Sequence, residues 1–188
     1  MSNTANQPKL YQNAFYDSIP GLRFDGTDDY LNFDLSKIVN SNYLIFIVEK
    51  RNNIMANCII GGNSFGQNTA IHVGYIGNAP QFIRFAHFGE GTNADFTTPA
   101  YKANDQVIHT FSFNGSTGKR YSKNGQIIGT VGQLAPLVSN NSVTIGKFGS
   151  GYYNGDLAEI IIFKRSLKTE EIEAVESYLG SKYGISVS

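Results

Sequence analysis

Residues 155–163 read GDLAEIIIF, an apolar run from Leu157 onwards that ends in three isoleucines and a phenylalanine. Apolar side chains occupy odd and even positions alike, so a strand formed here carries apolar groups on both of its faces. β-branched residues are enriched in strands. We therefore expect Asp156 to Phe163 to be a central strand of a sheet, covered on both sides by other layers.

An amphipathic helix is predicted directly after this strand. Thr169 is expected to cap it, and Glu170 and Glu171 place negative charge in the first turn, where the free amides and the helix dipole favour it. Gly184 suits a left-handed residue beyond the last turn. The apolar residues with near-helical spacing are Ile172, Val175, Leu179 and Tyr183. Such a helix should rest on an otherwise all-β body.

The rest of the chain alternates short apolar runs with Gly, Asn and Pro turns, which is typical of antiparallel sheets. Asn124-Gly125 is its strongest hairpin signal. We expect strands at Leu22–Phe24, Tyr30–Phe33, Tyr43–Lys50, Cys58–Gly61, Ala70–Ile76, Gln81–Phe88, Val107–Phe113, Arg120–Lys123, Gln126–Val131 and Ser142–Phe148. Residues 1–16 are expected to be a loosely ordered leader and residues 17–188 one domain, an all-β, two-sheet antiparallel jelly-roll sandwich with one C-terminal helix.

Composition narrows the range of partners. Lys plus Arg and Asp plus Glu both number 15, so the formal net charge is zero and electrostatic capture of nucleic acid is not expected. No stretch approaches the ~18 apolar residues of a membrane span, and the first residues lack the apolar core of a signal peptide. Cys58, the only cysteine, lies in a strand-like run and is expected to be a buried, inert thiol.

Three stretches together resemble the laminin G-like, concanavalin A-like lectin and glucanase family of the phage or bacterial surface-protein type. They are QPKL (7–10) with GLRFDGTDDYL (21–31), YSKNG (121–125), and GDLAE (155–159) through YGI (183–185). The resemblance implies two curved antiparallel sheets. It also implies a module of a larger virion or secreted protein, at a virion surface or outside the cell, with a glycan or host-surface receptor as its partner.

The nearest candidate for catalysis is the acidic pair Asp156 and Glu159. Laminarinase-type glycosidases of similar fold place their acids in one strand as Glu-x-Asp-x-x-Glu, and a retaining mechanism needs two carboxylates facing each other across the sugar. Here Asn154 stands at the first Glu position. The odd spacing of Asp156 and Glu159 puts them on opposite faces unless a bulge intervenes. We therefore expect no enzymatic activity.

Histidines and serines do not form a catalytic or metal-binding pattern either. His72, His87 and His109 fall in three separate predicted strands without the spacing of a zinc site. His109 alternates with Val107 and Phe111, so we interpret it as a hydrogen-bonded core residue.

Tyrosines are the candidates for sugar binding, which needs an aromatic surface and polar groups for the hydroxyls. The chain has 11 Tyr and no Trp. The predicted ligand-binding residues lie in two polar or Gly-rich loops and are Tyr152, Tyr153, Asn154, Tyr101, Asn93 and Asp95. The alternative is that Tyr152 and Tyr153 cover an edge of the sandwich.

Three aspartates offer a cation site, since Asp25, Asp28 and Asp29 bring hard oxygen ligands together in one turn. Structural calcium is one interpretation, and hydrogen bonding of the turn by its own aspartates is the other. Related jelly rolls often carry structural calcium at varying positions, so the resemblance keeps the first interpretation open, but the second is the one we favour.

The sequence thus favours a non-catalytic module that recognises a cell-surface glycan or another surface. A structural role, as a capsid or tail decoration or an oligomerisation domain in contact with copies of itself or other virion proteins, is the second hypothesis. A laminarinase-type glycoside hydrolase is the third.

Overall fold

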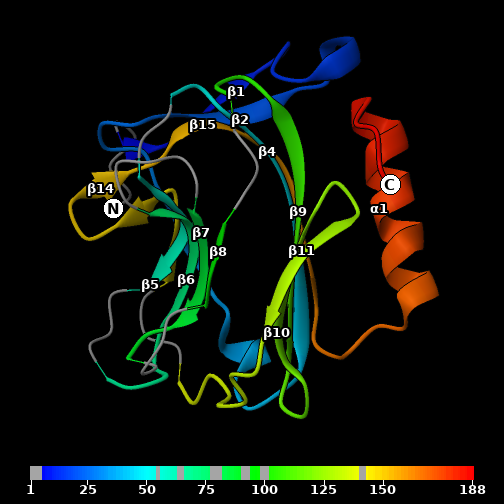
Figure 1. Cartoon of the computed structure of the whole chain (residues 1–188). Coiled ribbons are helices and arrows are strands. Elements are labelled where there is room, and N and C mark those ends of the chain that lie inside the picture. Colours follow the sequence, from blue (N-terminus) through cyan, green and yellow to red (C-terminus); the bar gives the residue numbers. More distant parts are fainter. Residues whose placement is uncertain are drawn as a thin grey trace.

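The computed structural model describes residues 6–53, 56–62, 66–76, 82–89, 94–97, 102–139 and 143–188. Two antiparallel sheets lie face to face, and one helix lies against the outer side of one of them (Figure 1). The sandwich predicted from the strand pattern is confirmed.

Sheet A, the sheet that carries the helix, has seven strands. In spatial order they are β1 (Lys9–Tyr11), β2 (Gly21–Asp25), β15 (Asn154–Phe163), β4 (Tyr43–Arg51), β9 (Gln106–Asn114), β10 (Gly118–Lys123) and β11 (Gln126–Val131). Sheet B has six, in the order β3 (Leu31–Phe33), β12 (Val143–Ile145), β5 (Cys58–Gly62), β6 (Ile71–Ile76), β7 (Phe82–His87) and β8 (Ala94–Thr97). A separate hairpin pairs β13 (Lys147–Phe148) with β14 (Gly151–Tyr152), and two short 3-10 turns cover Tyr16–Ser18 and Ser36–Ile38.

Strand β15 is the central strand expected from GDLAEIIIF, and it lies between β2 and β4. Its two faces enter two different cores, one between the sheets and one beneath the helix. The residues concerned are Leu157, Ile160 and Ile162 on the first face, and Ala158, Ile161 and Phe163 on the second. Cover on both sides is therefore confirmed.

Helix α1 (Thr169–Tyr183) packs on the outer face of sheet A, with Ile172, Leu179 and Tyr183 buried. Gly184 ends it in the left-handed conformation, at φ +64°, as expected. Thr169 is not its cap: the N-cap is Lys168, whose backbone N–H donates to Glu171 Oε2 at 2.8 Å. In the described part of the chain, no helix is long and apolar enough to cross a bilayer.

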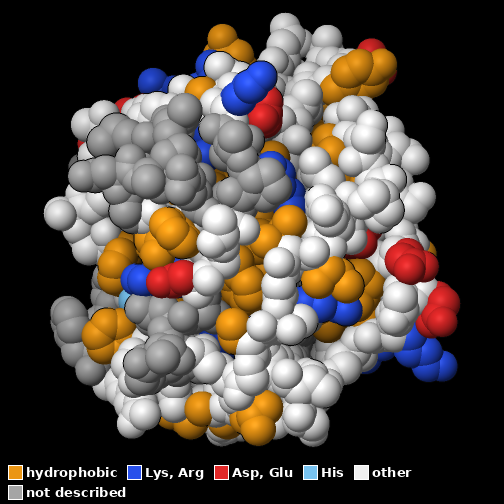
Figure 2. Space-filling model, viewed as in Figure 1, with side chains coloured by type: hydrophobic (Ala, Val, Ile, Leu, Met, Phe, Trp, Pro, Cys, Tyr) orange, Lys and Arg blue, Asp and Glu red, His pale blue; other side chains and the backbone are white. Residues whose placement is uncertain are grey.

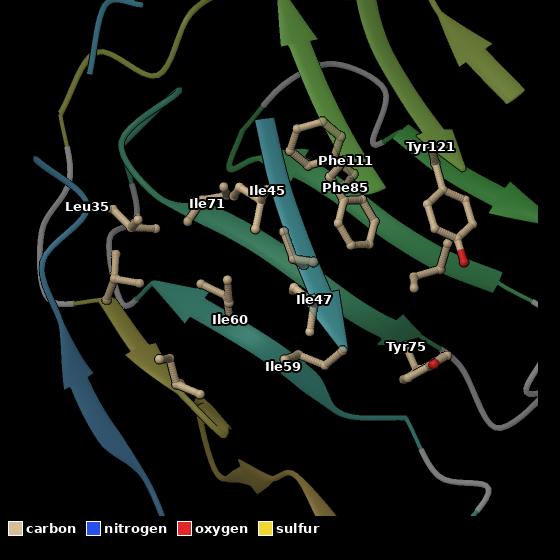
Figure 3. Close-up of a cluster of buried hydrophobic side chains, with 14 of the residues drawn as sticks. Leu35, Ile45, Ile47, Ile59, Ile60, Ile71, Tyr75, Phe85, Phe111 and Tyr121 are labelled. Carbon is tan, nitrogen blue, oxygen red and sulfur yellow. The ribbon is translucent and has the colours of Figure 1, made fainter. Parts of the chain in front are cut away.

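The main core fills the space between the sheets with aliphatic and aromatic side chains (Figure 3). Ile45 and Ile47 of β4 point into it beside Phe85 and Phe111. Tyr75 of sheet B and Tyr121 of sheet A extend the core toward one end of the sandwich. His109, expected as a core histidine, is fully buried there.

Three segments differ from the sequence-based expectation. Residues 9–16 are not a loose leader, because β1 pairs with β2 and Phe15 is buried against Tyr183. The expected strand Tyr30–Phe33 begins one residue later, as β3, and it joins sheet B, whereas β2 joins sheet A. Ala94–Thr97, expected in a polar loop, is strand β8 at the edge of sheet B, where an edge position tolerates polar side chains.

Candidate ligand-binding pocket

A pocket of about 340 Å³ opens on the outer face of sheet B. Core residues alternate with outward-facing ones along β6 and β7, so His72 and Arg84 point away from the core that holds Ile71 and Phe85. Figure 2 shows a basic side chain in contact with an acidic one, surrounded by apolar side chains, at the left of the view. Strands β5, β6 and β7 lie on that side of the molecule in Figure 1. The pocket, hereafter the sheet B pocket, is lined by Ala56, Asn57, Cys58, His72, Tyr75, Ile76, Arg84, Phe148 and Gly151.

Two glycines allow this pocket to form. A Cβ on Gly61 would lie 2.5 Å from the carbonyl oxygen of Lys147 and 2.8 Å from Cβ of Phe148, so only glycine lets hairpin β13–β14 fold down onto β5. A Cβ on Gly74 would lie 2.5 Å from Cα of Cys58, beside the irregular pairing of β5 with β6. The hairpin therefore forms one wall of the pocket, close to strands β5 and β6.

An aromatic pair marks the boundary between wall and floor. Phe148 is 39% exposed, and its ring centroid lies 4.2 Å from that of the buried His72. His72 Nε2 lies 3.2 Å from the carbonyl oxygen of Gly62. Burial lowers the pKa of His72, which favours a neutral ring that donates to Gly62 through Nε2. The pocket thus presents an exposed phenyl ring beside a neutral imidazole.

An ion pair lies at the opposite side of the floor. Arg84 of β7 and Asp95 of β8 are partners in the strand register, and Nε and Nη2 of Arg84 donate to Oδ1 and Oδ2 of Asp95 at 2.7 and 2.8 Å. The hydrogen bonds to Asp95 raise the pKa of Arg84, which keeps it charged. Together with the Asn57 amide, this pair supplies the polar groups of the site.

Only some of the sequence-predicted ligand-binding residues lie near this pocket. Tyr152 is half-buried in the hairpin wall, and Asp95 holds Arg84. Asn154 donates through Nδ2 to the carbonyl oxygen of Asp25, 3.2 Å away. Asn93 and Tyr101 lie outside the described residues. A ligand-binding role for Tyr152, Asn154 and Asp95 stays a prediction.

Tyr153 does not have the exposure expected of a sugar platform. It is 1% exposed, packs edge-on against Phe24 and donates its hydroxyl to Glu49 inside the sandwich. The chain leaves the β13–β14 hairpin at Tyr152 and enters β15 of sheet A at Asn154, so one of the two neighbouring tyrosines lies in the hairpin and the other in the core. The expectation that Tyr153 is exposed was therefore wrong.

Sequence analysis did not select His72, Arg84 or Phe148 for this site. The signal available was their position: His72 and Arg84 are the polar members of alternating runs, IHVGYI and FIRFAH, and so face away from the core. Which outward-facing residues meet is decided by the pairing of β5, β6, β7 and β8, which local patterns do not encode.

The three aspartates do come together, with ligand oxygens within 4.8 Å of one another. They also bind their own turn: Asp25 Oδ1 accepts from the backbone N–H of Thr27 at 2.7 Å, and Asp29 Oδ2 accepts from that of Asp25 at 3.0 Å. Burial raises the pKa of Asp29, which opposes its full ionisation. The turn is therefore held by its own carboxylates, and calcium bound there stays a prediction.

Asp156 and Glu159 share one face after all, because the register of β15 shifts between Leu157 and Glu159. Asp156 is fully buried and bound by Arg23, at 2.7 Å, and Lys50, at 3.3 Å. Glu159 binds Lys182 at 2.8 Å and accepts the hydroxyl of Tyr183 at 2.9 Å. Asp156 thus joins β15 to β2 and β4 within sheet A, and Glu159 joins sheet A to α1, an arrangement that differs from two carboxylates facing across an open groove.

Comparison with solved structures places the fold among jelly-roll sandwich domains. Domain 4 of an extracellular arabinanase from Geobacillus stearothermophilus, in complex with arabinotriose, superposes with a TM-score of 0.71 at 14% identity, over 93% of this chain and 84% of that one. The CBM40 domain of the IT-sialidase from Ruminococcus gnavus, bound to α2,3-sialyllactose, gives 0.64 at 18% identity, over 83% and 96%.

Botulinum neurotoxin type C, whose cell entry depends on interaction with two ganglioside molecules, gives a TM-score of 0.64 at 15% identity, over 92% of this chain and 45% of that one. No protein-family model and no curated protein matches the sequence. Likeness at these identities shows the fold alone: a two-sheet antiparallel jelly-roll sandwich with a C-terminal helix.

Proposed function

We propose that this domain is a non-catalytic module that binds a glycan in the sheet B pocket. The observation that carries the proposal is that the exposed ring of Phe148 lines the same pocket as Arg84, which is paired with Asp95, because sugar recognition combines an aromatic face with groups that bind hydroxyls. Structural neighbours that bind arabinotriose, sialyllactose and gangliosides support a carbohydrate ligand.

The chemistry of the pocket is suited to binding. A pyranose or furanose ring placed against Phe148 has its hydroxyls within the same pocket as the Asn57 amide, the His72 ring and the Arg84 guanidinium. The acids Asp156 and Glu159 are held in ion pairs on sheet A, so hydrolysis through this pair is not part of the proposal.

The setting of the module is also a proposal. We propose that it works at a virion surface or outside the cell as part of a larger protein. The botulinum neurotoxin type C structure, in which the match covers 45% of the chain, is an example in which a domain of this fold is one part of a longer chain.

Binding is tested with a glycan array and the variant Phe148→Ala. Loss of the aromatic face should weaken binding about tenfold, equivalent to about 1.4 kcal/mol. Tyr178→Ala is the matched control, because Tyr178 is an exposed aromatic residue on α1, which packs on sheet A. Equal loss in both variants, or binding that persists in Phe148→Ala, would place the ligand elsewhere. A protein that binds no glycan and forms a stable oligomer in light scattering would instead support the structural hypothesis.

A further inference from the structure

We infer that the sheet B pocket selects neutral glycans over acidic ones, because Asp95 neutralises the charged side chain that lines it. This inference rests on the proposed glycan-binding function and adds the chemical class of the ligand. It depends on the geometry of one ion pair and on the charges around it.

The geometry fixes Arg84 as half of a pair. The two carboxylate oxygens of Asp95 accept from Nε and Nη2 of Arg84, at 2.7 and 2.8 Å. The side chain of Arg84 is 26% exposed and that of Asp95 is 29% exposed. Such bidentate pairs have a fixed orientation and are stronger than neutral hydrogen bonds. Adjacent strands β7 and β8 hold the two residues in register, so Asp95, which does not itself line the pocket, stays bound to Arg84, which does.

The surrounding charges are few. Among the described residues that line the pocket, Arg84 is the only one of the Lys, Arg, Asp and Glu types. Lys147 of the hairpin lies over the rings of Tyr30 and Tyr152, 4.7 and 5.1 Å from their centroids, and does not line the pocket. With Asp95 bound to Arg84, the polar floor carries no net charge. A ligand carboxylate would have to displace Asp95 or lie next to it, and like charges at that separation repel.

Sugar hydroxyls match the pair better than a carboxylate does. Arg has five N–H groups, of which Asp95 takes two, and a carboxylate has about four lone-pair sites, of which Arg84 takes two. Donors and acceptors therefore lie next to each other. Each hydroxyl both donates and accepts, so two neighbouring hydroxyls can bind the guanidinium and the carboxylate together. A carboxylate only accepts.

The test uses an array of neutral oligosaccharides, each paired with a counterpart that carries one uronic or sialic acid. The unmodified protein should bind the neutral members more tightly, a comparison that needs no variant. Asp95→Asn leaves Arg84 charged without its counter-charge, so binding of the neutral members should fall about tenfold and binding of the acidic ones should rise about tenfold. Arg84→Gln should weaken the neutral members without any gain for the acidic ones.

The matched control is Glu171→Gln, which makes the same change in net charge. Glu171 forms a similar bidentate pair with Arg165, at 2.7 and 3.0 Å, at the start of α1. It should leave the preference unchanged. A similar gain for acidic glycans in Glu171→Gln, a preference of the unmodified protein for acidic glycans, or an Asp95→Asn variant with the original preference would each overturn the inference alone. Failure to bind any glycan would overturn the proposed function, and the inference with it.

Discussion

Glu49 is the residue that brings polar chemistry into the core. Its carboxylate is fully buried on the inner face of sheet A. The hydroxyl of Tyr75, from sheet B, donates to Oε1 at 2.5 Å, His109 Nε2 lies 3.0 Å from the same oxygen, and Tyr153 donates to Oε2. A buried charge is tolerated where several hydrogen bonds satisfy it, so this network connects the two sheets through one carboxylate.

Replacing Tyr153 by Phe should therefore destabilise the fold by about 1–3 kcal/mol, because a buried acceptor loses one donor while the ring keeps its contact with Phe24. Urea unfolding followed by circular dichroism measures the change. Tyr152→Phe is the control, since Tyr152 lies only half-buried in the hairpin, and it should change the free energy of unfolding by no more than ~0.5 kcal/mol. Equal effects at the two positions would mean that the hydroxyl of Tyr153 contributes nothing.

At the scale of elements, hairpin β13–β14 decides whether the pocket exists. It contacts β5 at Gly61, where a Cβ would lie 2.5 Å from a backbone oxygen that no side-chain rotation can move. Gly61→Ala should displace the hairpin and weaken glycan binding more than tenfold, and it should also lower the midpoint of urea unfolding.

Gly132→Ala is the matched control for this change. A Cβ on Gly132 would have no heavy atom within 4 Å beyond its chain neighbours, so a methyl group there meets no obstacle. The binding and stability of this variant should stay near those of the unmodified protein. Full binding by Gly61→Ala would show that the hairpin is not a wall of the site.

Elements with a local signature could be predicted from the sequence, and those defined by their partners could not. The apolar run of β15, the helix that ends at Gly184 and the alternation of β9 were all predicted correctly. The expected strand Ser142–Phe148 divides instead into β12 and β13, because Gly146 adopts φ +86° where a Cβ would lie 2.5 Å from the Phe24 ring. That constraint comes from a residue more than a hundred positions away.

The candidate site shows the same division. Asp95 is predicted from its polar neighbours in sequence, whereas its actual partner is Arg84, which the pairing of β7 with β8 brings to it. Tyr152 and Tyr153 are equivalent in sequence, yet one lies in the hairpin wall and the other in the core. Residue type is the same for these two tyrosines, so the long-range register of the strands decides where each of them lies.

At the scale of the whole molecule, the two sheets have different outer faces. α1 covers the outer face of sheet A, with Thr110 of β9 donating to the buried Glu176 at 2.5 Å. Sheet B carries no helix in the described chain, so its outer face stays open to a ligand between the hairpin and β7. The sheet B pocket therefore lies on the outer face that α1 does not cover, and the proposed function uses that face.

The stability of the whole sandwich should depend on pH through two buried histidines. Burial lowers the pKa of both His72 and His109 from the ordinary value of 6.5, so the unfolded chain binds protons at a pH where the folded chain does not. The free energy of unfolding should therefore fall as the pH is lowered from 7 to 5.5, by at most about 1.4 kcal/mol per pH unit for each histidine. Glu176 acts in the opposite direction, because burial raises its pKa above 4.5.

Urea unfolding at pH 7.5, 6.5 and 5.5 measures how the free energy of unfolding changes with pH. The variant His72→Gln shows how much of this change comes from His72. Gln is neutral throughout this range, so the slope of the variant should be shallower, and what remains comes from the other titrating groups, His109 among them. His109 is held among Glu49, Tyr75 and Tyr121. Glu49 raises the pKa of His109, but burial, together with Lys123 and Arg51, lowers it by more. A protonated ring there would face both the loss of its solvation and these two cations. Stability that is flat or rises between pH 7.5 and 5.5 would mean that the histidines are protonated in the folded protein, in which case Glu49 compensates the buried charge.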